Sequence, residues 1–347
     1  MADISIRTVG RVGRITLDRP DALNALTWSM IREIRTAVGR WASDDAVAML
    51  VIDAEGDKAF CAGGDLTELY AALAAGDQDT PRRFWREEYA MNAALFDFPK
   101  PVASFLQGYT MGGGVGVGCH ASHRVVCEGS AIALPECSIG LVPDVGSSLL
   151  LARAPGRLGE YLGLTGARAD PGSAIAAGLA DYFIPRQAWQ SVMSELIETG
   201  DWTLIDRATE APPKAALEQH LAEIDELFGG ETLRDIWTAL SRAETAFARK
   251  TRNQMAANAP LAMATALELI HRARARDRID EALRNEYRFA HRIAAHGDFQ
   301  EGIRAAIIDR DTSAKWAHAT PDAPTIGDVS AMLLPLGKDE LTLEANA

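Results

Sequence analysis

The sequence predicts an α/β protein in which a mostly parallel sheet is packed by helices and is followed by an all-helical C-terminal region. Two observations predict this class. In the first half, short apolar or alternating runs typical of strands are interleaved with segments of helical periodicity, which is the pattern of a parallel sheet. From about Pro185 the strand signals stop and long helical patterns take over. We therefore divide the chain into a core at residues 1–200 and a helical region at residues 201–347.

The strand and helix signals of the core come in a regular order. Residues 5–8 and 14–18 predict two short strands joined by a turn at Gly10–Gly13. Thr27 is a suitable N-cap for a helix whose apolar residues follow at helical spacing: Met30, Ile31, Ile34 and Val38. Unbroken apolar runs predict three buried strands, at residues 46–52, 102–106 and 125–127.

Beyond the core, the pattern is helical. The Ala211-Pro212-Pro213 stretch predicts a connector, and Gly229-Gly230 ends a helical piece. Residues 261–276 and 279–295, dense in Ala, Leu, Arg and Glu, predict two long helices. The tail at residues 320–347 has three prolines and weak periodicity, with an apolar stretch at 326–334 that is able to pack.

The composition restricts the classes of partner. The chain has 347 residues, 48% hydrophobic and 24% charged, with a net charge of −13. An acidic chain argues against a nucleic-acid surface, which needs clustered Lys and Arg to neutralise phosphates. No run approaches the ~20 apolar residues that span a bilayer, and residues 1–11 lack signal-peptide and transit-peptide features. We therefore expect a cytoplasmic protein with no membrane or nucleic-acid partner.

The cysteines do not predict disulfides or a metal site. Cys61, Cys119, Cys127 and Cys137 lie in apolar or glycine-rich stretches, and no CxxC pair occurs. This pattern favours reduced thiols. The pair His120 and His123 lies beside two of these cysteines, and its spacing would put both rings on one face of a helix, but the offsets fit no common zinc pattern. We expect neither a metal nor a redox cofactor.

Two glycine-rich motifs each precede a helical pattern. The first, AFCAGGD at residues 59–65, places Gly63 and Gly64 before Asp65, a suitable N-cap. The second, TMGGGVG at residues 110–116, opens a helix with three consecutive glycines, which costs chain entropy and needs a reason. The glycines permit close packing, or they present backbone N–H groups to a developing negative charge. The spacing fits neither a dinucleotide fingerprint nor a P-loop.

Carboxylates in apolar surroundings are the other candidates for chemistry. The segment LPECSIGLVPDVG places Glu136 and Asp144 among apolar residues, where a carboxylate is costly unless it is used or paired. Such groups are candidates for acid–base or nucleophilic work. The structural alternative is that Asp144 caps a helix near Val145 and Glu136 forms an ion pair. The segment FWREEY at residues 84–89, which contains Glu88, would on its own be a charged helix face, with Asn92 one turn on.

Together, the ordered motifs AFCAGGDL, TMGGGVG and PECSIGLVPDVG resemble the crotonase (enoyl-CoA hydratase/isomerase) superfamily over residues 5–185. This resemblance implies a ββα spiral core. RPDALNAL at residues 19–26 is similar to the segment of that family that lies against CoA. FWREEYAMN, MGGGVGVGCH and the late stretch at residues 298–316 resemble the 3-hydroxyisobutyryl-CoA hydrolase subgroup, so the likeness extends over nearly the whole chain.

The resemblance implies roles for particular residues. Gly64 and Gly113 would supply the N–H groups of an oxyanion hole, and Glu136 and Asp144 the catalytic carboxylates. Glu88 would hold the substrate's 3-hydroxyl together with Asp144. The other substrate-binding residues would be Gly63, Asp65 and Gly112, and CoA would lie against Arg19, Ala22, Leu23, Lys58 and Ala62, with Lys58 a candidate phosphate contact.

One departure from the family pattern bears on the reaction. Hydratases of this superfamily carry a Glu at the position of Gly116, so their paired-carboxylate machinery is missing here. We therefore predict hydrolysis of a short, branched 3-hydroxyacyl-CoA, with CoA as part of the substrate. An enoyl-CoA isomerase or hydratase of altered mechanism, and a catalytically silent CoA-binding protein, are the alternatives. The resemblance also implies a homo-oligomer, a trimer or hexamer, with a monomer left open by the helical region.

Overall fold

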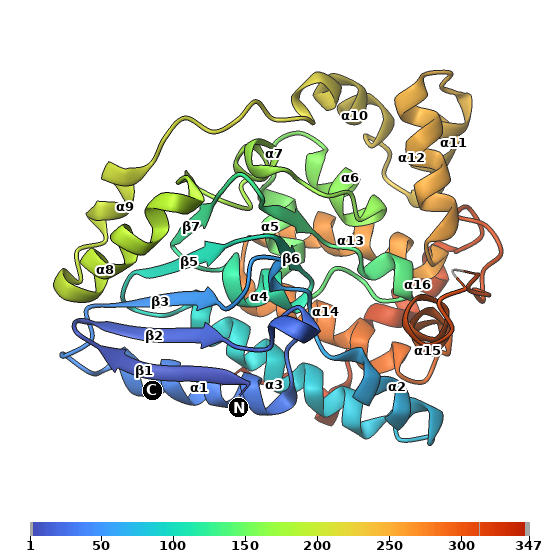
Figure 1. The fold of residues 1–347 in the computed structure, drawn as a ribbon. Helices are drawn as coiled ribbons and strands as arrows, with labels where there is room; N and C mark the ends of the chain where they lie inside the picture. Colours follow the sequence, from blue (N-terminus) through green and yellow to red (C-terminus); the bar gives the residue numbers. More distant parts are fainter. Residues whose placement is uncertain (1–2, 312, 344–347) are drawn as a thin grey trace.

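A computed structural model describes residues 3–311 and 313–343; residues 1–2, 312 and 344–347, which include the first positions, one position of the late matching stretch and the end of the tail, lie outside the described residues. The larger sheet has six strands in the order β1-β2-β3-β5-β7-β9 (Figure 1). Its strands are β1 (Ile4–Val9), β2 (Val12–Leu17), β3 (Met49–Ala54), β5 (Val102–Leu106), β7 (His123–Val126) and β9 (Tyr182–Phe183). Only the β1–β2 pair is antiparallel, so the predicted mostly parallel sheet is confirmed.

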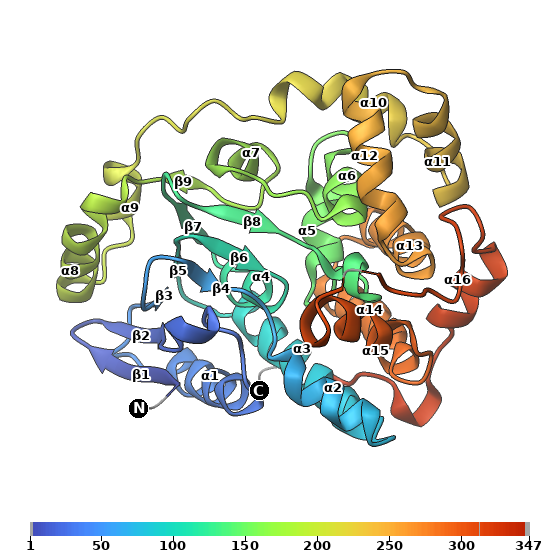
Figure 2. The ribbon, with the colours of Figure 1, turned by 45° about the vertical axis from the view of Figure 1, so that its right-hand side comes forward.

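A second, smaller sheet runs beside the first and explains the winding of the core (Figure 2). It consists of β4 (Ala59–Cys61), β6 (Tyr109–Met111) and β8 (Ala131–Ala133), all parallel. Each of its strands follows a strand of the larger sheet along the chain, namely β3, β5 and β7. The chain therefore adds one strand to each sheet per turn, which is the ββα spiral that the resemblance implied. The helices α2 (Leu66–Ala74) and α4 (Gly113–Gly118) follow the first two of these turns, directly after the two glycine-rich motifs.

Helices cover both faces of the larger sheet. Helix α1 (Trp28–Ala42) begins at Thr27, whose hydroxyl accepts a hydrogen bond from the Met30 N–H at 3.3 Å, as predicted. Helices α8 (Trp189–Thr199) and α9 (Thr203–Ala208) lie on the opposite face, where apolar residues of both pack on alternate residues of β3 and β5. The remaining helices of this half are α3 (Asp79–Phe96), α5 (Ser147–Arg153), α6 (Leu158–Thr165) and α7 (Pro171–Ala176).

The described residues after β9 form helices and loops, which confirms the helical C-terminal region. Its helices are α10 (Leu221–Leu227), α11 (Leu233–Arg242), α12 (Ala246–Ala257), α13 (Pro260–Arg276), α14 (Ile279–Ile293), α15 (Asp298–Ile303) and α16 (Ile326–Leu333). Helices α13 and α14 pack against α3, α5 and α6, and one apolar cluster contains residues from both halves. The division at residue 200 stays a prediction. Within the described chain, no helix has both the length and the apolar character to cross a bilayer.

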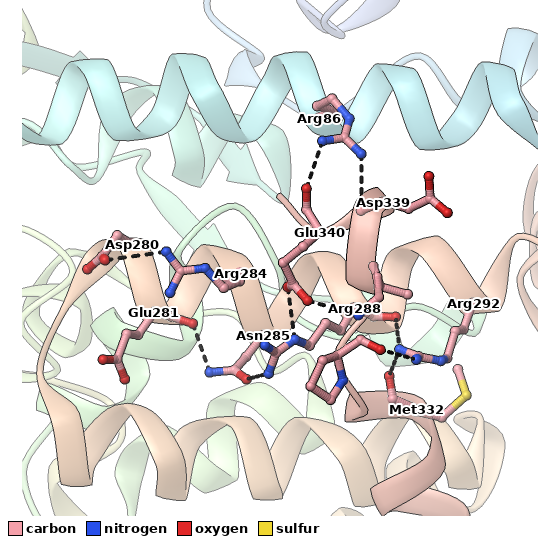
Figure 3. Close-up of polar contacts among 12 residues, drawn as sticks. Arg86, Asp280, Glu281, Arg284, Asn285, Arg288, Arg292, Met332, Asp339 and Glu340 are labelled. Atoms are coloured by element: carbon pink, nitrogen blue, oxygen red, sulfur yellow. Dashed lines mark hydrogen bonds and ion pairs between the residues drawn. The ribbon is translucent and has the colours of Figure 1, made fainter. Parts of the chain in front are cut away.

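The segment after α16 runs back across α14 to α3 and is held by three arginines (Figure 3). Arg292 of α14 donates to the carbonyl of Met332 at 3.0 Å, and Arg288 donates to the carboxylate of Glu340 at 2.9 Å. From α3, Arg86 donates to the carbonyls of Asp339 (2.9 Å) and Glu340 (3.2 Å). These bonds tie α3 and α14 together through the C-terminal segment. Within the stretch at 326–334, Met332 and Leu333 are buried whereas Ile326 and Leu334 are 75% and 57% exposed, so only part of the stretch packs as predicted.

Candidate active site

Both glycine-rich motifs and all three predicted acidic residues meet at one cavity of about 170 Å³. Its lining combines backbone from the glycine motifs, three carboxylates and an apolar wall: Ala62, Gly63, Gly64, Leu66, Leu69, Phe84, Trp85, Glu88, Gly112, Gly113, Pro135, Glu136, Ser138, Ile139, Leu141 and Asp144. Drug-sized ligands occupy pockets above about 300 Å³. The cavity therefore suits a short acyl group.

The amides of Gly64 and Gly113 are close to each other and free of ladder bonds. The bridge between Leu26 and Gly64 uses the carbonyl of Gly63 (2.8 Å from the Leu26 N–H) and the N–H of Asp65 (2.9 Å from the Leu26 carbonyl). Gly113 is the first residue of α4, where an N–H has no partner inside the helix. Neither amide donates to an acceptor in the described part of the chain. A Cβ built on Gly113 would lie 3.3 Å from the Gly64 nitrogen, so the two backbone N–H groups are neighbours in space.

Close packing, one of the two reasons considered for the consecutive glycines of the second motif, is confirmed, and the role of their N–H groups stays a prediction. A Cβ on Gly114 would lie 2.3 Å from the carbonyl oxygen of Cys61, so this position requires close packing. A Cβ on Gly112 would lie 2.9 Å from Oε1 of Glu136, and one on Gly113 would lie 2.7 Å from Oε1 of Glu88. Glycine at these two positions therefore brings the α4 entrance against two carboxylates.

Glu136 is buried without a partner. It begins the short 3-10 helix Glu136–Ile139 after β8, and its side chain is 5% exposed. Neither carboxylate oxygen has a hydrogen-bond partner, and no cation pairs with it among the described residues. The ion-pair alternative is therefore wrong. Burial, followed by the nearby Asp144 carboxylate, raises the pKa of Glu136 well above its ordinary value.

Asp144 faces the same cavity from the loop before α5. Its Oδ2 accepts a hydrogen bond from the Tyr89 hydroxyl at 2.6 Å. The alternative that Asp144 caps a helix is wrong for its side chain, because α5 has Gly146 as its N-cap and only the Asp144 carbonyl bonds to the Ser147 N–H. Burial raises the pKa of Asp144 to about 7, although the Tyr89 hydrogen bond acts in the opposite direction.

Glu88 completes the set of predicted carboxylates. It lies on α3 and is 3% exposed, and its Oε1 has no hydrogen-bond partner. Burial, and then the charge of Asp144, raise its pKa well above the ordinary value. Several carboxylates in one buried site cannot all ionise freely, so their protons are lost in steps that belong to the group as a whole. Such a site can hold a neutral acid and a carboxylate side by side.

The two segments predicted to face CoA lie next to each other. The carbonyl of Leu23 accepts a hydrogen bond from the Ala62 N–H at 3.0 Å, which joins the 19–26 segment to the first glycine motif. Asp65 caps α2 as predicted, with Oδ1 3.3 Å from the Thr67 N–H, while Oδ2 lies 3.2 Å from the Arg19 guanidinium. The Arg19 guanidinium therefore already has Asp65 as an ion-pair partner. The structure places Arg19, Ala22, Leu23 and Asp65 near the cavity but outside its lining.

Lys58 lies in an exposed turn directly before the first glycine-rich motif. Its carbonyl accepts from the Tyr109 N–H at 3.0 Å, and its ammonium group forms no ion pair with the described residues. The Asn24 amide donates to the carbonyls of Glu55 (3.0 Å) and Ala59 (2.9 Å), so the Lys58 turn is fastened to the 19–26 segment. The CoA contacts, including the phosphate contact of Lys58, stay predictions.

The structure separates the two histidines that the sequence places together. His120 lies after α4 and its Nε2 donates to the Val145 carbonyl at 2.7 Å, whereas His123 begins β7. The two rings therefore do not share a helix face, although their spacing would allow it. Within residues 3–311 and 313–343, no group of three or more His, Cys, Asp or Glu side chains is arranged to hold a metal ion. The four cysteines are buried and free.

Comparison with known proteins agrees with this geometry. The family model for enoyl-CoA hydratase/isomerase matches residues 12–333. The chain belongs to this family. Its curated relatives include 3-hydroxyisobutyryl-CoA hydrolase, mitochondrial, of Danio rerio, 34% identical over 92% of this chain and 86% of that protein. The protein of the same name from Homo sapiens is 33% identical over 98% of this chain and 90% of that protein. The resemblance to this superfamily and subgroup is confirmed.

Solved structures of the family share the whole fold. An enoyl-CoA hydratase from Rhodobacter sphaeroides has a TM-score of 0.95 and 50% identity, over 98% of this chain and all (100%) of that one. A carnitinyl-CoA dehydratase from Mycobacterium thermoresistibile has a TM-score of 0.93 and 36% identity, over 99% of each chain. The curated relatives are thus named hydrolases, whereas the solved structures are named a hydratase and a dehydratase. The curated relatives are also named mitochondrial, so the cytoplasmic location stays a prediction.

The neighbours of Gly116 fill the space beside it. A Cβ on Gly116 would lie 2.6 Å from Nδ2 of Asn92 and 2.7 Å from Cβ of Val145. Asn92 follows Glu88 by one turn on α3 and is fully buried. The space that a longer side chain would need at residue 116 is therefore filled by Asn92 and Val145.

The sequence did not identify two residues that contact the site. Tyr89 was seen only as part of a charged, aromatic helix, but its hydroxyl holds Asp144. Glu286 of α14 is fully buried and accepts hydrogen bonds from the residues that follow Asp144. A signal for Glu286 was present: it interrupts a row of apolar residues at helical spacing, Ile279, Ala282, Leu283, Tyr287, Ala290 and Ile293.

Proposed function

We propose that this chain hydrolyses the thioester of a short, branched 3-hydroxyacyl-CoA, with 3-hydroxyisobutyryl-CoA as the substrate, in valine catabolism. One observation carries the proposal: Glu136 has two buried, unpartnered carboxylate oxygens facing a cavity in which the amides of Gly64 and Gly113 are also free. A thioester needs a nucleophile or base at its carbonyl carbon and hydrogen-bond donors at its carbonyl oxygen. The hydrolase names of the curated relatives support the same assignment.

In the proposed reaction, the carbonyl oxygen accepts hydrogen bonds from Gly64 and Gly113. Each donor of such a pair typically contributes about 2.7–4 kcal/mol to the transition state. Glu136 then acts in one of two ways. Its carboxylate attacks the carbonyl carbon, the C–S bond breaks, and water hydrolyses the resulting anhydride; or it takes a proton from a water that attacks the carbon directly. In both routes water supplies the new carboxylate oxygen, and CoA leaves as a thiolate that is protonated to the thiol.

Asp144 and Glu88 would select for the 3-hydroxyl. A hydroxyl can donate to one carboxylate and accept from a protonated one, and the raised pKa values of both acids allow this mixed state near neutral pH. The Tyr89 hydroxyl holds Oδ2 of Asp144, which leaves Oδ1 for the substrate. The absence of a carboxylate at Gly116 removes the partner that superfamily hydratases use together with the acid matching Glu136.

The decisive experiment measures thiol release. Purified protein is incubated with 3-hydroxyisobutyryl-CoA and a thiol reagent, and in parallel with crotonyl-CoA while loss of the conjugated double bond is followed. We expect CoA release from the first substrate and no hydration of the second. Glu136→Gln should abolish most of the release while CoA binding persists. Asp144→Gly should impair 3-hydroxyisobutyryl-CoA more than isobutyryl-CoA.

A hydratase is the second candidate, because the solved relative with 50% identity is titled an enoyl-CoA hydratase. Hydration of crotonyl-CoA without thiol release would establish it in place of the hydrolase. A double-bond shift on a 3-enoyl-CoA would indicate an isomerase. CoA binding without turnover of any acyl-CoA would indicate a silent binding protein.

A further inference from the structure

Glu286 is a buried carboxylate that the proposed reaction does not use. It lies in the helical C-terminal region, on the face of α14 that packs into the protein, with an exposed fraction of 0%. A buried carboxylate is costly unless its oxygens are hydrogen-bonded. Its partners should therefore reveal what it is for.

All three partners of Glu286 lie directly after Asp144. Its Oε2 accepts a hydrogen bond from the Gly146 N–H at 2.6 Å. Its Oε1 accepts from the Ser148 N–H at 3.0 Å and from the Ser148 hydroxyl. One carboxylate oxygen thus bonds to the turn that joins Asp144 to α5, and the other to the first turn of α5 itself.

That turn has a conformation that needs support. Val145 has a φ of 55° and Gly146 a φ of 82°. A β-branched residue is strained in this left-handed region and stays there only when its surroundings impose it. Glu286 imposes it on one side, and the His120 ring, which donates to the Val145 carbonyl at 2.7 Å, imposes it on the other. The conformation of Val145 and Gly146 then determines the direction in which the Asp144 carboxylate points.

We propose that Glu286 is a positioning residue for Asp144: it holds the Val145–Gly146 turn so that the Asp144 carboxylate stays against Tyr89 and the cavity. This inference rests on the proposed function, in which Asp144 binds the 3-hydroxyl. Glu286 does not line the cavity, so it acts through the main chain and not by contact with the substrate. The helical C-terminal region thereby contributes to substrate selection.

Polar contacts of α14, the helix that carries Glu286, join it to α3 (Figure 3). Arg288 of α14 binds Glu340, and the carbonyl of Glu340 also accepts from Arg86 of α3. Because α3 carries both Glu88 and Tyr89, the two helices that position the acids are fastened to each other through the C-terminal segment. The placement of Glu286 relative to Tyr89 therefore does not depend on α14 packing alone.

The test compares two substrates, 3-hydroxyisobutyryl-CoA and isobutyryl-CoA, in full-length variants. A small displacement of a catalytic group can cost up to about 100-fold in rate, so Glu286→Gln should lower kcat/KM for the hydroxylated substrate by about tenfold or more. For isobutyryl-CoA the loss should stay within about twofold, the usual limit for sites that do not interact. Glu281→Gln is the matched control. It lies on the same helix, its carboxylate pairs with Arg276 (3.8 Å), and the substitution should leave both values unchanged.

A double variant tests whether Glu286 acts through Asp144. In the Asp144→Gly background, Glu286→Gln should change the ratio of the two kcat/KM values by no more than about twofold. Equal losses on both substrates, or an undiminished loss in that background, would overturn the inference. If Asp144→Gly itself leaves the ratio unchanged, the hydroxyl-binding role in the proposed function is at fault. If only Asp144→Gly changes it, the proposed function stands and the Glu286 inference is wrong.

A second variant decides the question if Glu286→Gln does not fold, as judged by circular dichroism. Ser148→Ala removes one of the three hydrogen bonds to Glu286 and leaves both backbone bonds. It should lower kcat/KM for the hydroxylated substrate selectively, by less than Glu286→Gln would. No selective loss in a folded Ser148→Ala protein would count against the inference.

Discussion

Gly116→Ala tests the packing that excludes the second hydratase carboxylate. The new methyl group would lie 2.6 Å from Nδ2 of Asn92 and 2.7 Å from Cβ of Val145. The Asn92 amide is the end of a side chain and can move. The Val145 Cβ is attached to a backbone in the left-handed region, with a φ of 55°, so it can move only with that turn. The substitution should therefore strain the core.

The expected magnitude is the difference of two terms. Overpacking a tight core costs about 1–3 kcal/mol. Alanine favours a helix interior by about 1 kcal/mol over glycine, which offsets part of this cost. We expect a net loss of up to about 2 kcal/mol in the free energy of unfolding, seen as a fall of up to a few degrees in Tm. Hydrolysis should fall as well, because Val145 adjoins Asp144.

Gly39→Ala is the matched control, measured by thermal and urea denaturation beside Gly116→Ala. Gly39 lies in the interior of α1, and a Cβ there meets nothing within 4 Å. The same substitution should therefore stabilise the protein at Gly39, by up to about 1 kcal/mol. A Gly116→Ala protein stabilised as much as Gly39→Ala would show that Asn92 and Val145 make room, and the steric explanation would be wrong. Gly116→Glu should likewise fail to hydrate crotonyl-CoA.

Three further outcomes follow from the site. Burial raises the pKa of Asp144 from 3.8 to about 7. Between these values the unfolded chain loses a proton that the folded protein keeps, so stability falls as pH rises from about 4 to 7. Asp144→Asn should therefore raise Tm at pH 8 and leave it nearly unchanged at pH 4, and a Tm gain independent of pH would contradict this. Tyr89→Phe removes a hydrogen bond that lowers the pKa of Asp144. The acid limb of the kcat/KM profile for 3-hydroxyisobutyryl-CoA should therefore move to higher pH. An unchanged acid limb would mean that Tyr89 does not influence the reaction. Arg86→Ala removes the hydrogen bonds to the carbonyls of Asp339 and Glu340. Limited proteolysis should then cut the C-terminal segment faster than in wild type. Equal rates of cleavage would mean that other contacts hold this segment.

Local patterns in the sequence predicted much of the fold. The strand at 102–106 was predicted to the residue, because the preceding prolines fix where it can begin. The strand predicted at 46–52 instead spans Met49–Ala54. The Val47 N–H bonds to the Asp44 carbonyl in a turn, and an apolar run does not distinguish a buried turn from a buried strand. Helix ends at caps such as Thr27 were predicted because the capping bond is local.

The site was predictable only where its residues lie in motifs. The glycines and the acids at 136 and 144 were found because each is unusual in its own surroundings. The contacts that organise them are distant: Tyr89 and Asp144 are 55 residues apart, and Gly146 and Glu286 are 140 apart. The fit of Asn92 against Gly116 is equally invisible in sequence, because neither residue reveals which side chain faces the other.

The divided names of the relatives are consistent with one physical account of how the chemistry can change within this fold. Gly64, Gly113 and Glu136 suit any reaction that places charge on a thioester oxygen. By the resemblance to the superfamily, its hydratases carry a second carboxylate on α4, at the position of Gly116. A carboxylate there requires an empty space between α3 and the turn at Val145, and here Asn92 and Val145 occupy it. A change of reaction therefore needs coordinated changes on α3, α4 and the turn after Asp144. Because Glu286 contacts that turn from α14, the helical C-terminal region belongs to the same set of constraints. We therefore expect exchange of residue 116 alone to destabilise the protein without producing hydratase activity.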